Sequence, residues 1–316
     1  MMKIPFTKAQ AALNDFVIVD DREGSIPVEA RKAFAREACL RRKGIGGDGV
    51  IFIEKNNLVE FTMAFYNPDG TDGSMCGNGG RCAALFAYRK GIAGSEMGFE
   101  VMNQYYKALI LDDGVRLFFP PPKTIRLNFK LRLRDKTVTA HYVHNGAPHV
   151  VVFIDDFESA SYLSLDDIPV RSLGQEIRLH GDFRPVGVNA NFVSIDTDQH
   201  VHIRTFEKGV EAETASCGTG AIAAAIVSHA VRNIEPPVTL HTFGGDCLTV
   251  GFRPLSEADR VEIIPFIESD IRSAGIGNDL YLEGPAHLVF EGVTCFDEEH
   301  LLLVWPEEDR GQVRSR

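Results

Sequence analysis

Residues 67–82 read NPDGTDGSMCGNGGRC, and this stretch guides the interpretation of the whole chain. It opens with Pro-Asp-Gly, a sequence typical of a turn. Cys76 then precedes a glycine-rich segment, and residues 81–90 after it are compatible with a helix. A cysteine at a helix N-terminus lies beside unsatisfied backbone N–H groups and the positive end of the helix dipole, which favour its thiolate form. The stretch therefore predicts a reactive cysteine.

The same pattern occurs in the second half of the chain. Cys217 is followed by Gly-Thr-Gly and an alanine-rich helical run, as Cys76 is followed by Gly-Asn-Gly. A second likeness joins residues 15–20 (DFVIVD) to residues 191–196 (NFVSID), and both segments are strand-like. The alternative is two unrelated helix starts that happen to contain cysteine. We favour a duplication in which each half carries one cysteine at the start of a helix.

Composition limits the classes of function. A chain of 316 residues with 44% hydrophobic residues is long enough for two domains with hydrophobic cores. A net charge of −11 without a basic stripe makes nucleic acid and anionic membranes poor partners. The longest apolar run, residues 221–227, is too short to cross a bilayer. Six scattered cysteines without a C-x-x-C spacing, and an N-terminus without an apolar signal region, favour reduced thiols and a cytoplasmic location.

Short strand patterns outnumber helices along the chain. A helix is expected at residues 27–42, and the glycine-rich turn at residues 44–49 lacks the Lys-Ser/Thr of a phosphate-binding loop. Further strands are expected at residues 16–19, 50–53, 59–66, 98–101, 105–111, 115–119, 125–133, 137–143, 150–154, 190–195, 202–206, 238–240 and 248–252. This pattern predicts an α+β fold with two similar halves and a site between them.

Three consecutive prolines at 120–122 indicate a linker between the halves. The expected N-terminal half is residues 1–122 plus 284–316, and the expected C-terminal half is residues 123–283. Residues 253–278 are polar and weakly patterned, which indicates an insertion.

Three histidines in the second half raise the question of a metal site. His141, His144 and His149 are close in sequence but lack the tight spacing with cysteines or carboxylates that is typical of zinc sites. We therefore expect no metal, and we expect His149 to lie in a turn formed by residues 146–149.

Two cysteines at matching helix N-termini suit the inversion of a carbon centre. Inversion requires a base that removes a proton from one face of the carbon and an acid that supplies a proton to the other. A thiolate and a thiol can exchange these roles, and the N–H groups that follow each cysteine could hold a substrate carboxylate. No metal, nicotinamide or other cofactor is required. A redox pair would have adjacent cysteines, and a hydrolytic enzyme would need one thiol.

The motifs resemble those of diaminopimelate epimerase, a family of pyridoxal-independent amino-acid epimerases of lysine and peptidoglycan biosynthesis. The matching segments are Asn14–Phe16, Gly44–Gly49, Asn67–Cys82, Gly146–His149, Gly187–Phe192, Glu207–Gly220 and Leu282–Pro285. The resemblance implies two pseudo-symmetric domains, each a strongly curved, mostly antiparallel sheet wrapped around a central helix, with the active site in the cleft between them. It also implies conversion of LL-2,6-diaminopimelate to meso-diaminopimelate without a cofactor.

The same resemblance implies roles for individual residues. Cys76 and Cys217 would be the base and the acid, and His149 and Glu207 would assist proton transfer. The substrate-binding residues that it implies are Asn14, Asn67, Gly77, Asn78, Asn189, Lys208, Gly218 and Thr219, the glycines, Asn78 and Thr219 acting through their backbone amides.

Two positions depart from the usual pattern of the family. Lys208 stands where arginine is usual, and Ala147 stands where asparagine is common. Lysine keeps the charge but lacks the two-pronged hydrogen bonding of a guanidinium. The alternatives are therefore an epimerase or racemase of histidine, proline or hydroxyproline type, and an inactive homologue that binds an amino acid. The expected partner is a small amino-acid substrate, and a homodimer is considered as well.

Overall fold

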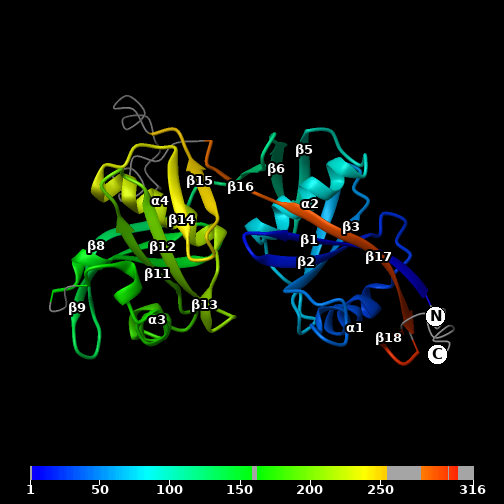
Figure 1. The fold of residues 1–316 in the computed structure, drawn as a ribbon, viewed down its shortest axis with the longest axis horizontal. Coiled ribbons are helices and arrows are strands. Elements are labelled where there is room, and N and C mark those ends of the chain that lie inside the picture. The colour runs from blue at the N-terminus through cyan, green and yellow to red at the C-terminus, as the bar shows by residue number, and fades with distance from the viewer. Residues whose placement is uncertain (1, 159–161, 255–278, 298, 305–316) are drawn as a thin grey trace, which may run out of the picture. The chain divides into compact units, whose positions relative to one another are not determined.

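The structure is a computed structural model, and it describes residues 2–158, 162–254, 279–297 and 299–304 (Figure 1). The chain falls into two compact units: unit 1 comprises Met1–Val115 and Ala286–Arg316, and unit 2 comprises Arg116–Pro285. The expected domain boundaries, after residues 122 and 283, stay a prediction, because compactness alone does not define an independently folding domain.

Unit 1 is a mixed sheet with two helices, α1 (Val28–Cys39) and α2 (Gly77–Arg89). Its strands are β1 (Met2–Ala11), β2 (Asn14–Asp20), β3 (Gly49–Glu54), β4 (Phe61–Tyr66), β5 (Glu96–Val101), β6 (Gln104–Ile110), β17 (His287–Asp297) and β18 (Leu302–Val304). Pairing runs from β18 through β17, β1, β2, β3, β4 and β5 to β6. Among these described pairs, β2–β3 and β4–β5 are parallel and the rest are antiparallel. The parallel pairs are joined by α1 and α2, because a parallel pair needs a crossover connection.

Unit 2 has the helices α3 (Val170–Arg178) and α4 (Gly218–Arg232), with short 3₁₀ helices at Ile154–Asp156, Leu165–Asp167 and Gly181–Phe183. Its strands are β7 (Val115–Phe118), β8 (Thr124–Arg132), β9 (Thr137–His144), β10 (Pro148–Phe153), β11 (Asn189–Ile195), β12 (Val201–Glu207), β13 (Ala212–Thr214), β14 (Val238–Thr242), β15 (Cys247–Gly251) and β16 (Tyr281–Gly284). Pairing runs from β8 through β9, β10, β11, β12, β14 and β15 to β16, and β13 also pairs with β12. The parallel pairs are β10–β11, which is joined by α3, and β12–β14, which is joined by α4.

The two units repeat one topology. The series β1, β2, α1, β3, β4, α2, β5, β6 matches β9, β10, α3, β11, β12, α4, β14, β15 in the order and direction of every strand pair. This confirms the predicted α+β fold with pseudo-symmetric halves. The likeness of residues 15–20 to 191–196 was wrong as a sign of this repeat, because β2 matches β10 and not β11. Both segments belong to buried parallel pairs, and burial selects similar apolar residues.

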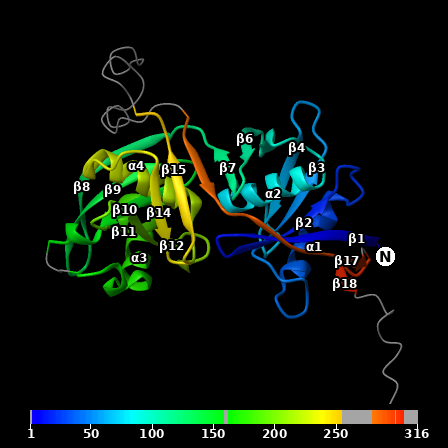
Figure 2. The same cartoon turned by 45° about the horizontal axis from the view of Figure 1, so that its top comes forward.

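The two helices that begin after the cysteines are the central helices of their units. In unit 1, α2 packs on β1, β2, β3, β6 and β17 (Figure 2), and in unit 2, α4 packs on β9, β10, β11, β12, β14 and β15. Residues 77–84 of α2 and 220–228 of α4 are all buried. A helix surrounded by protein favours small and apolar residues on every side, which accounts for the glycine and alanine in both segments.

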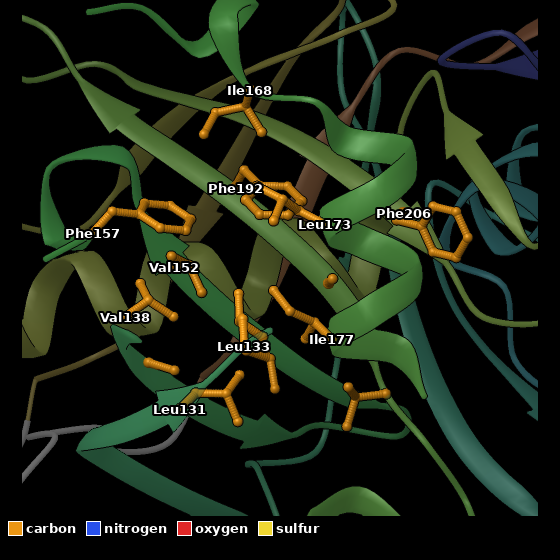
Figure 3. Close-up of a cluster of buried hydrophobic side chains, with 14 of the residues drawn as sticks. Leu131, Leu133, Val138, Val152, Phe157, Ile168, Leu173, Ile177, Phe192 and Phe206 are labelled. Atoms are coloured by element: carbon orange, nitrogen blue, oxygen red, sulfur yellow. The ribbon is translucent and has the colours of Figure 1, made fainter. Parts of the chain in front are cut away.

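The sequence analysis missed α3, which covers the other face of the sheet in unit 2. Val170, Leu173, Gly174 and Ile177 are its buried residues, at the i, i+3, i+4, i+7 spacing of an amphipathic helix. Val170, Leu173 and Ile177 join Val152, Phe192 and other residues of β8–β12 in one hydrophobic cluster (Figure 3). The helix has only nine residues, and the polar residues between its buried positions make the apolar periodicity weak.

The expected insertion at residues 253–278 lies, apart from its first two residues, outside the described part of the chain, as does the tail from Glu307. Among the described residues, no helix has both the length and the apolar character needed to cross a membrane.

Candidate active-site residues around the two cysteines

Cys76 is the N-cap residue of α2, as the sequence predicts. Its extended backbone (φ −110°, ψ 119°) turns the chain from the loop into the helix, and its half-buried Sγ accepts a hydrogen bond from the Gly79 N–H at 3.4 Å. The thiol also donates to Asn14 Oδ1 at 3.6 Å. Asn78 Nδ2 donates to the same oxygen at 3.3 Å. The structure therefore brings together three residues of unit 1 that the sequence nominated: Asn14, Cys76 and Asn78.

Asn14 is held by a charged network that the sequence analysis missed. Its Nδ2 donates to Asp48 Oδ2 at 2.8 Å, and the same carboxylate accepts the Asp15 N–H. Asp15 forms ion pairs of 2.7 Å with both Lys8 and Arg41. Burial raises the pKa of Asp15, but the hydrogen bonds from Arg41 and Lys8 outweigh burial and lower the pKa to about 2. The network fixes the amide of Asn14, so that its oxygen faces the thiol.

Arg81 lies within the first turns of α2 and is fully buried. Its guanidinium donates to Asn78 Oδ1 at 2.7 Å and to the Gly77 carbonyl at 3.4 Å. Gly77 and Asn78 are the residues whose amides are expected to bind the substrate carboxylate. Arg81 therefore holds this turn in place, and these hydrogen bonds offset part of the cost of burying its charge.

Cys217 is the N-cap residue of α4 in unit 2, with a similar extended backbone (φ −126°, ψ 110°). Its half-buried Sγ lies 3.6 Å from the hydroxyl Oγ1 of Thr219. Thr219 Oγ1 is in turn 2.9 Å from His149 Nε2. The structure thus joins His149, Thr219 and Cys217, which the sequence nominated separately, through the Thr219 hydroxyl.

The expected turn at residues 146–149 is wrong for Pro148 and His149, which begin strand β10. Because side chains alternate along a strand, His149 points to the α4 face while Val150 joins the hydrophobic cluster on the α3 face. Burial lowers the pKa of His149 to about 3, with a smaller contribution from His144. His149 is therefore neutral at physiological pH. No group of three or more His, Cys, Asp or Glu side chains in the described chain is arranged to hold a metal ion.

Asn189 and Lys208 are also brought together. Asn189 Nδ2 donates to the Pro148 carbonyl at 3.0 Å, and its Oδ1 accepts the Lys208 N–H at 2.8 Å. Glu207, one residue earlier, accepts a hydrogen bond from Thr214 Oγ1 at 2.9 Å. The amide of Asn189 thus ties the start of β10 to the end of β12.

Asn67 lies in a turn that precedes the Cys76 loop. It closes the turn of residues 67–71, where its N–H donates to the Thr71 carbonyl and its Nδ2 donates to Thr71 Oγ1 at 3.0 Å. Its expected role in binding stays a prediction.

The sequence analysis missed Asn191, which lies two residues after Asn189 and on the same face of β11. Its Nδ2 lies 3.2 Å from His149 Nδ1. The signal was present, because residues i and i+2 of a strand share a face and the segment 187–192 carries the family resemblance.

Comparison with solved structures first defines the class of fold. The chain superposes on a phenazine biosynthesis protein of the PhzF family from Bacillus anthracis with a TM-score of 0.64 and 12% identity, covering 94% of this chain and 100% of that one. A probable proline racemase from Agrobacterium radiobacter K84 gives a TM-score of 0.63 and 14% identity, with 93% of each chain covered. These likenesses show that the chain shares the fold of the PhzF-family protein and the probable proline racemase.

Sequence comparison then defines the family. The family model described as diaminopimelate epimerase matches residues 6–115 and 141–250, one segment in each unit. The diaminopimelate epimerase of Hydrogenobaculum sp. (strain Y04AAS1) is 36% identical over 301 residues, which cover 92% of this chain and 98% of that protein. This chain belongs to the diaminopimelate epimerase family.

Proposed function

We propose that this protein is an isomerase that converts LL-2,6-diaminopimelate to meso-diaminopimelate by inverting one α-carbon. Membership of the family supports the substrate. The observation that carries the reaction type is the pair of N-cap cysteines, because Cys76 and Cys217 occupy the same position at the head of the central helix of their unit. The wider group of folds includes proline racemases, but the matched family favours diaminopimelate over proline, hydroxyproline or histidine.

In the proposed reaction, one cysteine is a thiolate that removes the α-proton, and the other is a thiol that donates a proton to the opposite face of the same carbon. The first bond broken is the α C–H bond, and its electron pair is delocalised into the adjacent carboxylate. The N–H groups of Gly77 and Asn78, with those of Gly218 and Thr219, stabilise the developing charge on that carboxylate. The reverse reaction exchanges the two roles. Protons and electrons balance without a cofactor.

The remaining candidates bind the rest of the substrate. Asn14, Asn67 and Asn189 offer amide groups to its amino and carboxylate ends, and Lys208 offers a positive charge to the distal carboxylate. Glu207 assists proton transfer on the side of Cys217. Because thiolate chemistry requires reduced cysteines, we place the reaction in the cytoplasm, where it supplies lysine and peptidoglycan precursors. A homodimer is a further prediction that light scattering after size exclusion would check.

The proposal is tested by incubating the purified, reduced protein with LL-diaminopimelate and separating the stereoisomers by chiral chromatography. We expect an equilibrium mixture of the LL and meso forms without added pyridoxal phosphate or metal. L-proline, trans-4-hydroxy-L-proline and L-histidine serve as comparison substrates. Turnover of one of these, with none of LL-diaminopimelate, would contradict the proposed substrate. Tight binding of LL-diaminopimelate without any isomerisation would indicate the inactive homologue.

A further inference from the structure

A line of hydrogen bonds in unit 2 leads from Asn191 to Cys217. The orientation of the Asn191 amide is fixed by its surroundings, because Nδ2 is 2.9 Å from the Val150 carbonyl, which can only accept a hydrogen bond. On the other side, the Thr205 hydroxyl donates to Asn191 Oδ1 at 2.9 Å. The second N–H of the amide is then directed at His149 Nδ1, 3.2 Å away.

This contact determines which ring nitrogen of His149 carries the proton. An amide nitrogen only donates, so His149 Nδ1 must accept, and in the neutral ring the hydrogen then resides on Nε2. Nε2–H therefore donates to Thr219 Oγ1 at 2.9 Å. His149 and Asn191 are both fully buried, so water does not compete for these bonds. Burial also lowers the pKa of His149 to about 3, which keeps the ring neutral.

The tautomer decides what the Thr219 hydroxyl can do. A hydroxyl has one hydrogen and two lone pairs. The His149 Nε2–H group donates to one lone pair of Thr219 Oγ1, so the hydroxyl hydrogen is not used by His149. Thr219 can therefore donate that hydrogen to a Cys217 thiolate, 3.6 Å away, or accept the S–H of a Cys217 thiol. In the other tautomer, Nε2 would be an acceptor and would take the hydroxyl hydrogen away from the sulfur.

We propose that Asn191 is a positioning residue, which holds His149 in the Nε2–H tautomer and so reserves the Thr219 hydroxyl hydrogen for Cys217. This inference rests on the proposed function only in taking Cys217 as a reacting thiol. A hydroxyl that can both donate and accept suits a cysteine that alternates between thiolate and thiol in the two directions of the reaction.

The packing around Asn191 restricts the position of its side chain. Gly220 is the third residue of α4, and a Cβ on it would lie 2.5 Å from Asn191 Oδ1 and 3.4 Å from Cys217 Sγ. The close approach of α4 to β11 therefore requires glycine here. Gly79 holds the same position after Cys76, where a Cβ would instead meet the flexible ends of Met63 and Ile51 at 3.2 and 3.3 Å.

The tautomer is tested directly by NMR of the full-length protein labelled with ¹⁵N-histidine, since protonated and unprotonated ring nitrogens have distinct shifts. The His149 signals are assigned by their loss in His149→Gln. We expect a neutral ring with the proton on Nε2 from pH 5 to pH 8 in the wild type. A proton on Nδ1 in the wild type would overturn the proposal, whether or not the protein turns over diaminopimelate.

Variants then test the role. Asn191→Asp has the same shape but places an acceptor against His149 Nδ1, so we expect the proton to move to Nδ1 and kcat to fall tenfold or more with little change in KM. Thr205→Val is the matched control, because it loosens the other end of the same amide and should leave the Nε2–H tautomer in place. A folded Asn191→Asp protein with the wild-type tautomer would contradict the assignment.

The last step, from Thr219 to Cys217, has a readout independent of substrate. The rate at which iodoacetamide alkylates Cys217 is followed by mass spectrometry of its peptide in a Cys76→Ala background. Thr219→Val and Asn191→Asp should both slow the alkylation of Cys217 severalfold, whereas Thr219→Ser, which keeps the hydroxyl, should react at the rate of the parent protein. Equal rates in Thr219→Val and wild type would overturn the link to Cys217. If the wild-type protein does not turn over diaminopimelate but shows the expected tautomer and alkylation rates, that result counts only against the proposed function.

Discussion

The thiol of Cys76 lies 3.6 Å from the side-chain oxygen of Asn14, the first residue of β2. Cys217 occupies the equivalent place in unit 2, yet its Sγ lies at the same distance from the hydroxyl oxygen of Thr219. An amide oxygen only accepts a hydrogen bond, whereas a hydroxyl both donates and accepts. The repeated fold thus gives the two cysteines the same backbone setting but different hydrogen-bonding partners.

Asn14→Asp should make the Cys76 thiolate harder to form. The substitution keeps the shape of the side chain but puts an anionic oxygen against the sulfur, and like charges disfavour ionisation. It also sets a second carboxylate against Asp48, which now accepts from Asn14 at 2.8 Å. We expect kcat to fall at least tenfold, and we expect slower alkylation of Cys76 at pH 8.

Asn103→Asp is the control for this change, because it adds the same charge to unit 1 at an exposed turn between β5 and β6. Asn103→Asp should leave kcat and the rate of Cys76 alkylation near the wild-type values. An equal loss in the two variants would mean that net charge, and not the contact between Asn14 and Cys76, is responsible.

Alanine at the two matching glycines should have unequal effects. In Gly220→Ala the new Cβ would lie 2.5 Å from Asn191 Oδ1, an atom already held by Thr205, so Asn191 must shift. In Gly79→Ala the nearest atoms are flexible ends of side chains at 3.2 Å or more. Alanine is otherwise favoured over glycine in a helix by about 1 kcal/mol. We expect a loss in kcat of tenfold or more for Gly220→Ala and a smaller loss for Gly79→Ala.

Steady-state kinetics of the two variants, together with the ¹⁵N signals of His149, check this prediction. If Gly220→Ala kept wild-type kcat with an unchanged His149 spectrum, the close packing of α4 against Asn191 would have no functional role.

Arg81→Lys should destabilise unit 1 although it conserves charge. An ammonium group cannot reproduce the fork with which Arg81 reaches both Asn78 and the Gly77 carbonyl. Hydrogen bonds to charged groups contribute about 1.5–3 kcal/mol each, so we expect a loss of roughly 2–3 kcal/mol in the free energy of unfolding. Urea denaturation measures the loss. Arg89→Lys, at an exposed position in the last turn of the same helix, should change stability by less than about 0.5 kcal/mol.

Stability should fall as the pH falls from about 6.5 toward 4. Burial lowers the pKa of His141 to about 4 and of His149 to about 3, whereas an unfolded histidine titrates near 6.5. Within that window the unfolded chain binds more protons than the native one, so the stability contributed by these neutral rings is complete above pH 6.5 and is lost as the pH decreases. Each such proton changes the free energy of unfolding by about 1.4 kcal/mol per pH unit.

His149→Gln should therefore flatten the dependence of stability on pH between 6.5 and 4 by about one proton. Urea denaturation at a series of pH values measures this slope. An unchanged slope would mean that His149 is protonated in the native protein, against the burial described above.

Sequence reasoning reached the α+β fold class and the placement of both cysteines because these depend on local patterns, whereas the central position of the two helices was expected only from the family resemblance. The glycine-rich start of α2 after Cys76 and the apolar, β-branched runs of β3 and β10 can be read from neighbouring residues. Arg81 could not be recognised in this way, since arginine on a helix is usually exposed and only the packing of the strands around α2 makes it buried. Asn191 was missed because its role depends on the pairing register of β10 with β11, which places it diagonally opposite His149.

The most direct test of the two-thiol reaction is epimerisation of LL-diaminopimelate in D2O under reducing conditions, with Cys76→Ala and Cys217→Ala beside the wild type. If one thiol removes the proton and a different thiol supplies its replacement, the first meso product carries solvent deuterium at the inverted carbon while the remaining LL substrate keeps its proton. We expect that pattern in the wild type and no inversion in either variant. Inversion that persists in either variant, or product that retains the substrate proton, would contradict the account.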